Sequence, residues 1–65
     1  MLMSQEESAR AIFLRNLVVG DKVRVPHLKG TGAVIGLNNR VHILMENGPY
    51  WELIVVLKWE QVWPI

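Results

Sequence analysis

Two histidines and one glycine-rich segment are the residues of this sequence whose types could support catalysis or ligand binding. Neither His27 nor His42 has a carboxylate or a nucleophile at a spacing that is diagnostic of catalysis. Lys29 precedes a Gly-Thr-Gly segment at 30–32, and such a loop cradles a phosphate when the N-terminus of a helix lies behind it. Here a β-strand is predicted to follow, so we interpret residues 30–32 as a structural bend.

The sequence offers little else for catalysis or metal binding. It contains no cysteine, which excludes disulfides, thiol nucleophiles and cysteine-based zinc sites. The two histidines cannot complete a four-ligand metal site without carboxylates. A chain of 65 residues rarely encloses a deep pocket with a full catalytic set, and an enzyme of this size would build its site between subunits. We therefore predict a non-enzymatic protein with no bound cofactor or metal.

Basic and aromatic residues carry the remaining binding chemistry. Seven Lys and Arg oppose six Asp and Glu, and a net charge of +1 disfavours a dedicated nucleic-acid module. Lys22 and Arg24 share the outward face of one predicted strand, where they could steer an acidic partner or contact phosphates. Trp and Tyr are common at interface hot spots and also stack on bases. The predicted partner-binding set is Lys22, Arg24, Lys29, Arg40, Tyr50, Trp51, Lys58 and Trp59.

A helix is predicted over residues 1–17, at the start of a single domain. Ser4 and Glu7 have the spacing of a capping box, in which each side chain satisfies a backbone donor of the other residue. Arg10 and Arg15 lie off the apolar stripe of this helix. The helix either covers one open end of the domain or binds a partner. The stripe consists of Ala9, Ile12, Phe13 and Leu17.

Residues 18–65 are predicted to form a small β-barrel, because glycines and prolines divide short β-branched runs there. Asn38 and Asn39 indicate a tight hairpin turn, since Asn tolerates a positive φ. Valines 23 and 25 are expected to face inward, and so are Val41, Ile43 and Met45. The predicted strands are 22–25, 33–35, 41–45, 50–58 and 62–63, with a second turn at 47–49 and a 3₁₀ turn at 59–61.

The run Leu53–Leu57 is apolar on both faces of its predicted strand. A strand of an isolated small barrel needs only one apolar face, so the outer face of this strand must be covered. Either the N-terminal helix covers it within the chain, or a second subunit covers it. We therefore expect a protein partner or host complex, or a homo-oligomer formed through Leu53–Leu57 or through the N-terminal helix.

The length of the apolar segments sets an expectation for location. The longest unbroken apolar run, 53–57, is far too short to cross a bilayer, so no membrane span is predicted. No charged start followed by an apolar stretch resembles a signal peptide. We expect a cytoplasmic protein, either free or at the periphery of a membrane complex.

The first part of the β-rich region resembles the opening of SH3-like barrels, including the KOW motif of ribosomal and transcription-elongation proteins. Residues 20–25 have the Gly-Asp-x-Val-x-Val start, and residues 29–34 supply the glycine-rich bend and a Gly-x-Val strand. Type II plasmid-borne dihydrofolate reductases and several small photosynthetic subunits share this opening, so it specifies a fold better than a function. The implied fold class is all-β, a five-stranded SH3-like barrel over 18–65 with an N-terminal α-helix over 1–17.

The second half, residues 41–62, resembles the ferredoxin-docking S subunit of the cyanobacterial and chloroplast NAD(P)H dehydrogenase-like complex. The resemblance implies a docking module, a small subunit of a larger photosynthetic assembly that recruits an acidic partner such as ferredoxin. The basic residues 22, 24, 29, 40 and 58 would attract that partner, and the Trp residues would anchor the barrel to its host complex. The matching residues are Glu46-Asn47-Gly48, Trp51-Glu52, 54–57, Lys58 and Glu60.

Two alternative functions follow from the same opening motif. A KOW-type module would bind RNA or DNA through Lys22, Arg24 and the Tyr50-Trp51 pair. An enzyme similar to type II dihydrofolate reductase would assemble four barrels around one pore that binds folate and NADPH. That family has a Val-Gln-Ile-Tyr stretch where this chain has Glu-Leu-Ile-Val at 52–55, without the polar pair.

Overall fold

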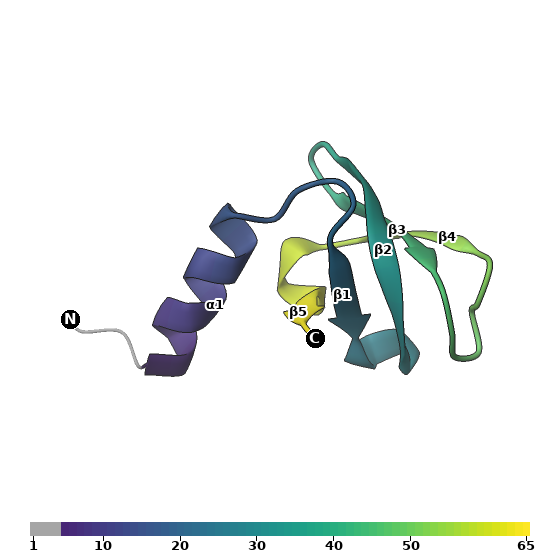
Figure 1. The fold of residues 1–65 in the computed structure, drawn as a ribbon, viewed down its shortest axis with the longest axis horizontal. Coiled ribbons are helices and arrows are strands. Elements are labelled where there is room, and N and C mark those ends of the chain that lie inside the picture. The colour runs from purple at the N-terminus through teal and green to yellow at the C-terminus, as the bar shows by residue number, and fades with distance from the viewer. Residues whose placement is uncertain (1–4) are drawn as a thin grey trace.

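A five-stranded antiparallel sheet and one short α-helix make up the computed structural model, which describes residues 5–65 (Figure 1). The strands lie in the spatial order β4-β3-β2-β1-β5, so β4 and β5 are the two edges of an open sheet. The predicted β-rich class with five strands is confirmed, whereas the strand pairings of residues 5–65 do not close a barrel. The elements are α1 (Gln5–Arg15), β1 (Lys22–Val25), the 3₁₀ turn η1 (Pro26–Leu28), β2 (Gly30–Leu37), β3 (Val41–Met45), β4 (Ile54–Leu57), the 3₁₀ turn η2 (Trp59–Gln61) and β5 (Trp63–Pro64).

The core lies on one face of the sheet and follows from the alternation of side chains along each strand. Val23 and Val25 of β1 are fully buried, and β3 buries every second residue, as predicted. Burying one such side chain is worth about 1.5–3 kcal/mol, so these few residues supply most of the apolar driving force. The buried cluster consists of Leu17, Val23, Val25, Val34, Val41, Ile43, Met45, Leu57 and Val62.

The glycine-rich segment 30–32 is part of strand β2, so its prediction as a bend is wrong. β2 extends from Gly30 to Leu37 and pairs with β1 on one side and β3 on the other. A Cβ atom on Gly32 would lie 2.5 Å from the Cγ2 atom of Ile43 and 2.6 Å from the carbonyl oxygen of Leu44. A glycine is therefore required here because the neighbouring strand approaches closely, and not because the chain turns.

The last predicted long strand is shorter than expected. Residues 50–52 form a turn, in which the Trp51 N–H donates to the Gly48 carbonyl at 3.2 Å, and β4 begins only at Ile54. Glu52 has a φ of 67°, which is incompatible with an extended strand. The Asn38–Arg40 segment does turn, but its residues lack the positive φ that motivated the prediction.

Helix α1 lies against the β5 edge of the sheet (Figure 1). The guanidinium carbon of Arg10 lies 3.7 Å from the centroid of the Trp63 ring, and the Arg10 Nη2 group donates a hydrogen bond to the Glu60 carbonyl. Phe13 packs against the core, and Leu17 beyond the helix is buried. Arg10 thus belongs to the contact face, and the predicted stripe is wrong at Ala9 and Ile12, which are both exposed.

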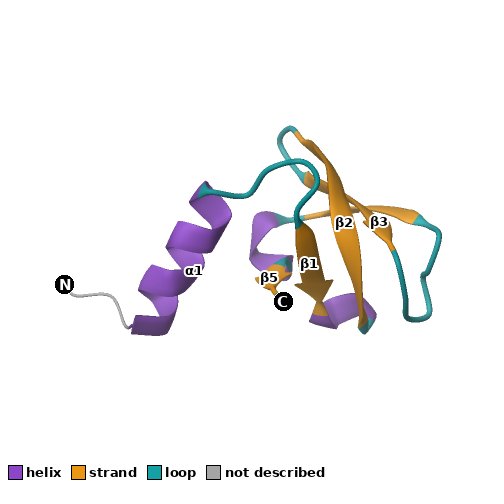
Figure 2. Ribbon diagram, viewed as in Figure 1, coloured by secondary structure: helices purple, strands orange, loops and turns teal. Residues whose placement is uncertain are grey.

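The position of α1 decides between the two predicted ways of covering the Leu53–Leu57 strand. The helix packs at β5, and β4 lies at the opposite edge, as Figure 2 shows. The prediction that the helix covers β4 is therefore wrong, and the outer face of β4 stays exposed.

Of the predicted capping pair, Ser4 lies outside the described residues, and the side chain of Glu7 is not described. α1 has 11 residues, and within residues 5–65 no helix is both long and apolar enough to span a membrane.

Two isoleucines at opposite extremes of burial test the assignment of the two sheet faces. Ile43 is fully buried, whereas Ile54 is 63% exposed. Because Ile43→Val removes one methyl group from the close-packed core, we expect it to lower the free energy of unfolding by about 1 kcal/mol. The matched variant Ile54→Val is expected to change it by less than about 0.5 kcal/mol. Urea unfolding of both variants at low protein concentration measures the difference, and equal losses would contradict the assignment.

The contact of Arg10 with Trp63 predicts how α1 is held. Arg10→Ala removes the cation–π contact and the hydrogen bond to Glu60, so we expect a loss of about 1 kcal/mol and faster amide exchange throughout α1. Arg15→Ala, at an exposed position of the same helix, serves as the control and is expected to leave exchange in α1 unchanged. Hydrogen exchange that is equally slow in the wild type and in Arg10→Ala would refute this account.

Candidate functional site

Large apolar side chains gather on the outer face of β3 and β4, where no element of residues 5–65 covers them. Leu44 pairs directly with Ile54 in the β3–β4 register, so their side chains lie on the same face. Ile54 is 63% exposed, Val56 is 56% exposed, and Trp51 in the preceding turn is 58% exposed. We call Leu44, Trp51, Ile54 and Val56 the β4 patch. Contiguous apolar surface of this kind marks interaction sites, whereas single exposed residues do not.

The backbone of β4 is open at the same place. The Met45 N–H donates to the Leu53 carbonyl at 2.9 Å, which fixes the side of β4 that faces β3. In an antiparallel pair successive residues alternate, so the backbone groups of Val55 and Leu57 face β3 and those of Ile54 and Val56 point away. Exposed edges are normally protected by lysines, prolines or bulges. The four residues of β4 are all apolar and carry none of these protections.

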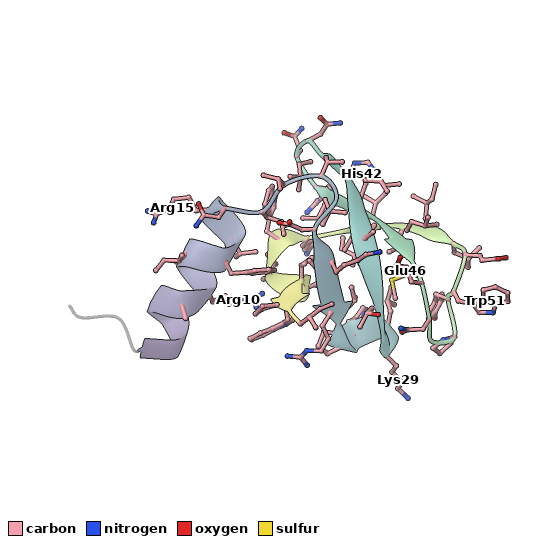
Figure 3. All side chains as sticks on the ribbon, in the orientation of Figure 1. Arg10, Arg15, Lys29, His42, Glu46 and Trp51 are labelled. Carbon is pink, nitrogen blue, oxygen red and sulfur yellow. The ribbon has the colours of Figure 1, made fainter. Side chains whose placement is uncertain are left out.

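A shallow hollow adjoins the β4 patch. Its lining combines Leu44 and Trp51 with two carboxylates, those of Glu46 and Glu52. Figure 3 labels Glu46 and Trp51. The Lys22 Nζ atom lies 2.5 Å from the Glu46 Oε2 atom, so one of these two charges is already paired. Within residues 5–65 no cluster of three or more His, Asp or Glu side chains could hold a metal ion. The chemistry of the hollow suits an apolar or basic side chain of a partner.

Asn47 holds the turn that begins beside this hollow. Its Oδ1 atom accepts a hydrogen bond from the Thr31 N–H at 2.8 Å, and its Nδ2 group donates to the Thr31 Oγ1 atom at 2.7 Å. Gly48 follows with a φ of 83°, and a Cβ atom there would lie 2.6 Å from the Lys29 carbonyl oxygen. The Glu46-Asn47-Gly48 motif therefore has a structural role, which is to fasten the β3–β4 turn to the start of β2.

The basic residues predicted to bind a partner do not share one surface. Lys22 is paired with Glu46, as described above. Lys29 precedes β2 and Arg40 follows its far end, so the eight-residue length of β2 separates them. Arg24 on β1 lies opposite Trp63, and Lys58 lies between β4 and η2.

The aromatic residues and histidines also lie in different surroundings. Tyr50 and Trp51 are exposed in the β3–β4 turn, where Figure 3 shows Trp51 at the outer end of the sheet. Trp59 in η2 packs against the core, which gives it a role in packing. His27 is exposed in η1, and His42 is half-buried on β3 opposite Val56.

Sequence analysis identified the open strand but missed part of the site. The run Leu53–Leu57 indicated that an apolar outer face needs a cover. The alternation in 41–45, with residues 41, 43 and 45 inward, leaves Leu44 on the outward side of its strand, yet Leu44 is absent from the predicted partner-binding set. The pairing of Lys22 with Glu46 could not be anticipated, because β2 lies between their strands.

Comparisons of the chain with protein-family models, with curated proteins and with solved structures found no match in any of the three. The function is therefore argued from the geometry of the described residues.

The two hydrogen bonds of Asn47 predict a stability effect that separates this residue from other turn asparagines. Because Asn47→Ala leaves the Thr31 N–H and hydroxyl without their partner, we expect a loss of about 1–2 kcal/mol in the free energy of unfolding. The control Asn39→Ala, in the exposed β2–β3 turn, is expected to cost less than about 0.5 kcal/mol. Thermal unfolding monitored by circular dichroism measures both, and equal effects would contradict a special role for Asn47.

Proposed function

We propose that this chain is a non-enzymatic protein-interaction module whose contact surface is the β4 patch. The observation that carries the proposal is that unpaired backbone groups and exposed apolar side chains occur together at the β4 edge. The outward backbone groups of Ile54 and Val56 lie at a sheet edge, and their side chains are more than half exposed on the adjoining face. A partner can therefore satisfy hydrogen bonds and bury apolar surface in one contact, as in β-strand addition.

The energetics of the β4 patch support binding. Fully burying a side chain such as Ile54 or Val56 is worth about 1.5–3 kcal/mol. Trp51 belongs to the patch and lines the hollow with Leu44, and tryptophan is strongly enriched among residues that dominate interface energies. Helix α1 cannot reach the patch while it packs at β5, so the surface remains available to another chain.

The proposal extends to the fold family, to a role as a subunit and to the chemistry of the partner. The strand order and the 3₁₀ turn before β5 support an SH3-like barrel as the family of folds. Part of the segment that resembles the ferredoxin-docking subunit, from Glu46 to Glu52, folds as one turn that adds Trp51 to the β4 patch, which supports a role as a small subunit of a larger assembly. An acidic partner such as ferredoxin would meet Arg24 and Lys29, which are both exposed, in a contact separate from the β4 patch.

The separation of the basic residues bears on the nucleic-acid alternative. A phosphate-binding surface needs several cations along one path, and affinity falls with each one that is lost. Here Lys22 is paired with Glu46, while Lys29 and Arg40 lie at opposite ends of β2. The observations therefore favour a protein partner over RNA or DNA.

Photo-crosslinking in the source cells tests the proposed contact surface. A photoreactive benzoylphenylalanine in place of Ile54 is expected to yield discrete covalent adducts with protein, because position 54 lies within the interface. The same residue in place of Asn39, exposed in the β2–β3 turn, is the matched control and is expected to yield few adducts. Mass spectrometry of the adduct identifies the partner, including ferredoxin or a second copy of this chain. Adducts that are no more abundant from position 54 than from position 39 would reject the β4 patch.

A further inference from the structure

We propose that the partner of the β4 edge is a second copy of this chain, paired antiparallel through β4 with Val55 opposite Val55. This inference rests on the proposed function, because it takes the β4 edge as the contact surface. Two copies related by a two-fold axis would then form one sheet of ten strands. Three independent features of β4 and its flanks point to a second copy in this register.

The first feature is the number of backbone hydrogen bonds that the register allows. The outward-pointing groups of β4 are the N–H and C=O groups of Ile54 and Val56. When Val55 lies opposite Val55, Ile54 of each copy lies opposite Val56 of the other. Each such pair exchanges two hydrogen bonds, so the four outward groups of each strand are all satisfied.

The second feature is that the neighbouring registers are blocked by contacts already made. In the alternative symmetric registers, the residue that lies opposite its own copy is Ile54 or Val56 instead of Val55. These two registers keep each side chain on its own face of the sheet. Centring on Ile54 requires Glu52 in the ladder, but its φ is 67° and its N–H donates to the Met45 carbonyl at 2.8 Å. Centring on Val56 requires Lys58, whose N–H already donates to the Gln61 Oε1 atom at 3.1 Å.

The third feature is the arrangement of charge at the two ends of the strand. The sequence from 52 to 58 is Glu-Leu-Ile-Val-Val-Leu-Lys, with an acid at one end and a base at the other. Antiparallel pairing centred on Val55 brings Glu52 of each copy to Lys58 of the other copy. Both side chains are exposed at the ends of the strand and are free of the core. The segment is therefore complementary to itself in hydrogen bonding, apolar contacts and charge.

In this arrangement the apolar surface on the outer face of the sheet continues from one copy to the other. Leu44 lies beside Ile54 in the existing register, and Ile54 would lie beside Val56 of the second copy. An apolar row then crosses the junction between the two sheets. The other edge of the sheet does not offer this surface, because β5 has only two residues and α1 packs there.

Cysteine substitutions read the register directly, because the natural chain has no cysteine. In the proposed register the two Val55 residues form a non-hydrogen-bonded pair, with Cα atoms about 4.5 Å apart, which a disulfide can bridge. Position 54 would lie about 7–8 Å from its own copy, as would position 56, which is too far for a disulfide. The experiment compares Val55→Cys, Ile54→Cys and Val56→Cys during oxidation with diamide, which accepts the two electrons and two protons of each thiol pair.

We expect Val55→Cys to form a covalent dimer about tenfold faster than either neighbour, at a protein concentration where the wild type is dimeric by light scattering. Faster crosslinking at position 54 or 56 would overturn the register. Equally slow crosslinking at all three positions, with a wild-type mass near 7.5 kDa at every concentration, would overturn the dimer. Circular dichroism of the reduced variants checks that each one folds.

A charge exchange tests the same register without altering the apolar strand. Glu52→Lys and Lys58→Glu each place like charges together at both ends of the dimer, so each should weaken dimerisation by about tenfold in sedimentation equilibrium. The double variant Glu52→Lys/Lys58→Glu restores opposite charges and should return the dissociation constant to within about threefold of the wild type. A double variant as weak as the single variants would contradict the pairing of Glu52 with Lys58.

These experiments separate failure of the dimer from failure of the proposed function. If the chain remains a monomer while position 54 crosslinks to another protein in cells, the dimer is wrong and the β4 patch still binds a partner. If position 54 yields no adducts and the chain is a monomer, both proposals fall. If the crosslinked adduct is a second copy of this chain and Val55→Cys bridges fastest, both are supported.

Discussion

Backbone groups at the edge of a β-sheet require partners, and this chain treats its two edges differently. The β5 edge has α1 packed against it through the contact of Arg10 with Trp63, and it consists of only two residues. The β4 edge has four apolar residues and exposes both its backbone and two side chains. Because residues 5–65 contain one short α-helix, covering one edge of the sheet with it leaves the other edge open. The candidate function arises from this asymmetry, since the open edge is where another chain can add.

The fold was predictable where local pattern and tertiary packing agree. In 41–45 every second residue is apolar and inward, and strand β3 forms there with the predicted bounds. The pattern failed at Tyr50 and Trp51, whose aromatic side chains favour strands. Hydrogen bonds between Asn47 and Thr31 fix the start of that turn, and they join residues 16 positions apart, which no local pattern reveals. Arg10 was misplaced for a related reason, because its charge marked it as exposed while its guanidinium packs on an aromatic ring.

The candidate site was predictable in composition but not in location. The run Leu53–Leu57 showed that some apolar surface needs a cover, but whether α1 supplies it depends on which sheet edge the helix meets. That choice is made by tertiary contacts of the helix, those of Arg10 with Trp63 and Glu60 and of Phe13 with the core, which the spacing of residues along β4 does not reveal. The basic residues illustrate the opposite error. They were predicted mainly as one charged set, whereas the Lys22 side chain forms an ion pair with Glu46 and the length of β2 separates Lys29 from Arg40.

The hydrogen-bonded Asn47 side chain also bears on the chemical ageing of the protein. In an Asn-Gly dipeptide the glycine nitrogen can attack the asparagine side-chain carbonyl, release ammonia and form a succinimide that hydrolyses to aspartate or isoaspartate; such asparagines are among the thermolabile residues of proteins. In the folded chain both amide atoms of Asn47 are engaged by Thr31, which restrains the side-chain rotation that cyclisation requires. Unfolded copies lack this restraint and deamidate faster. The lifetime of Asn47 thus reports how much time each molecule has spent unfolded.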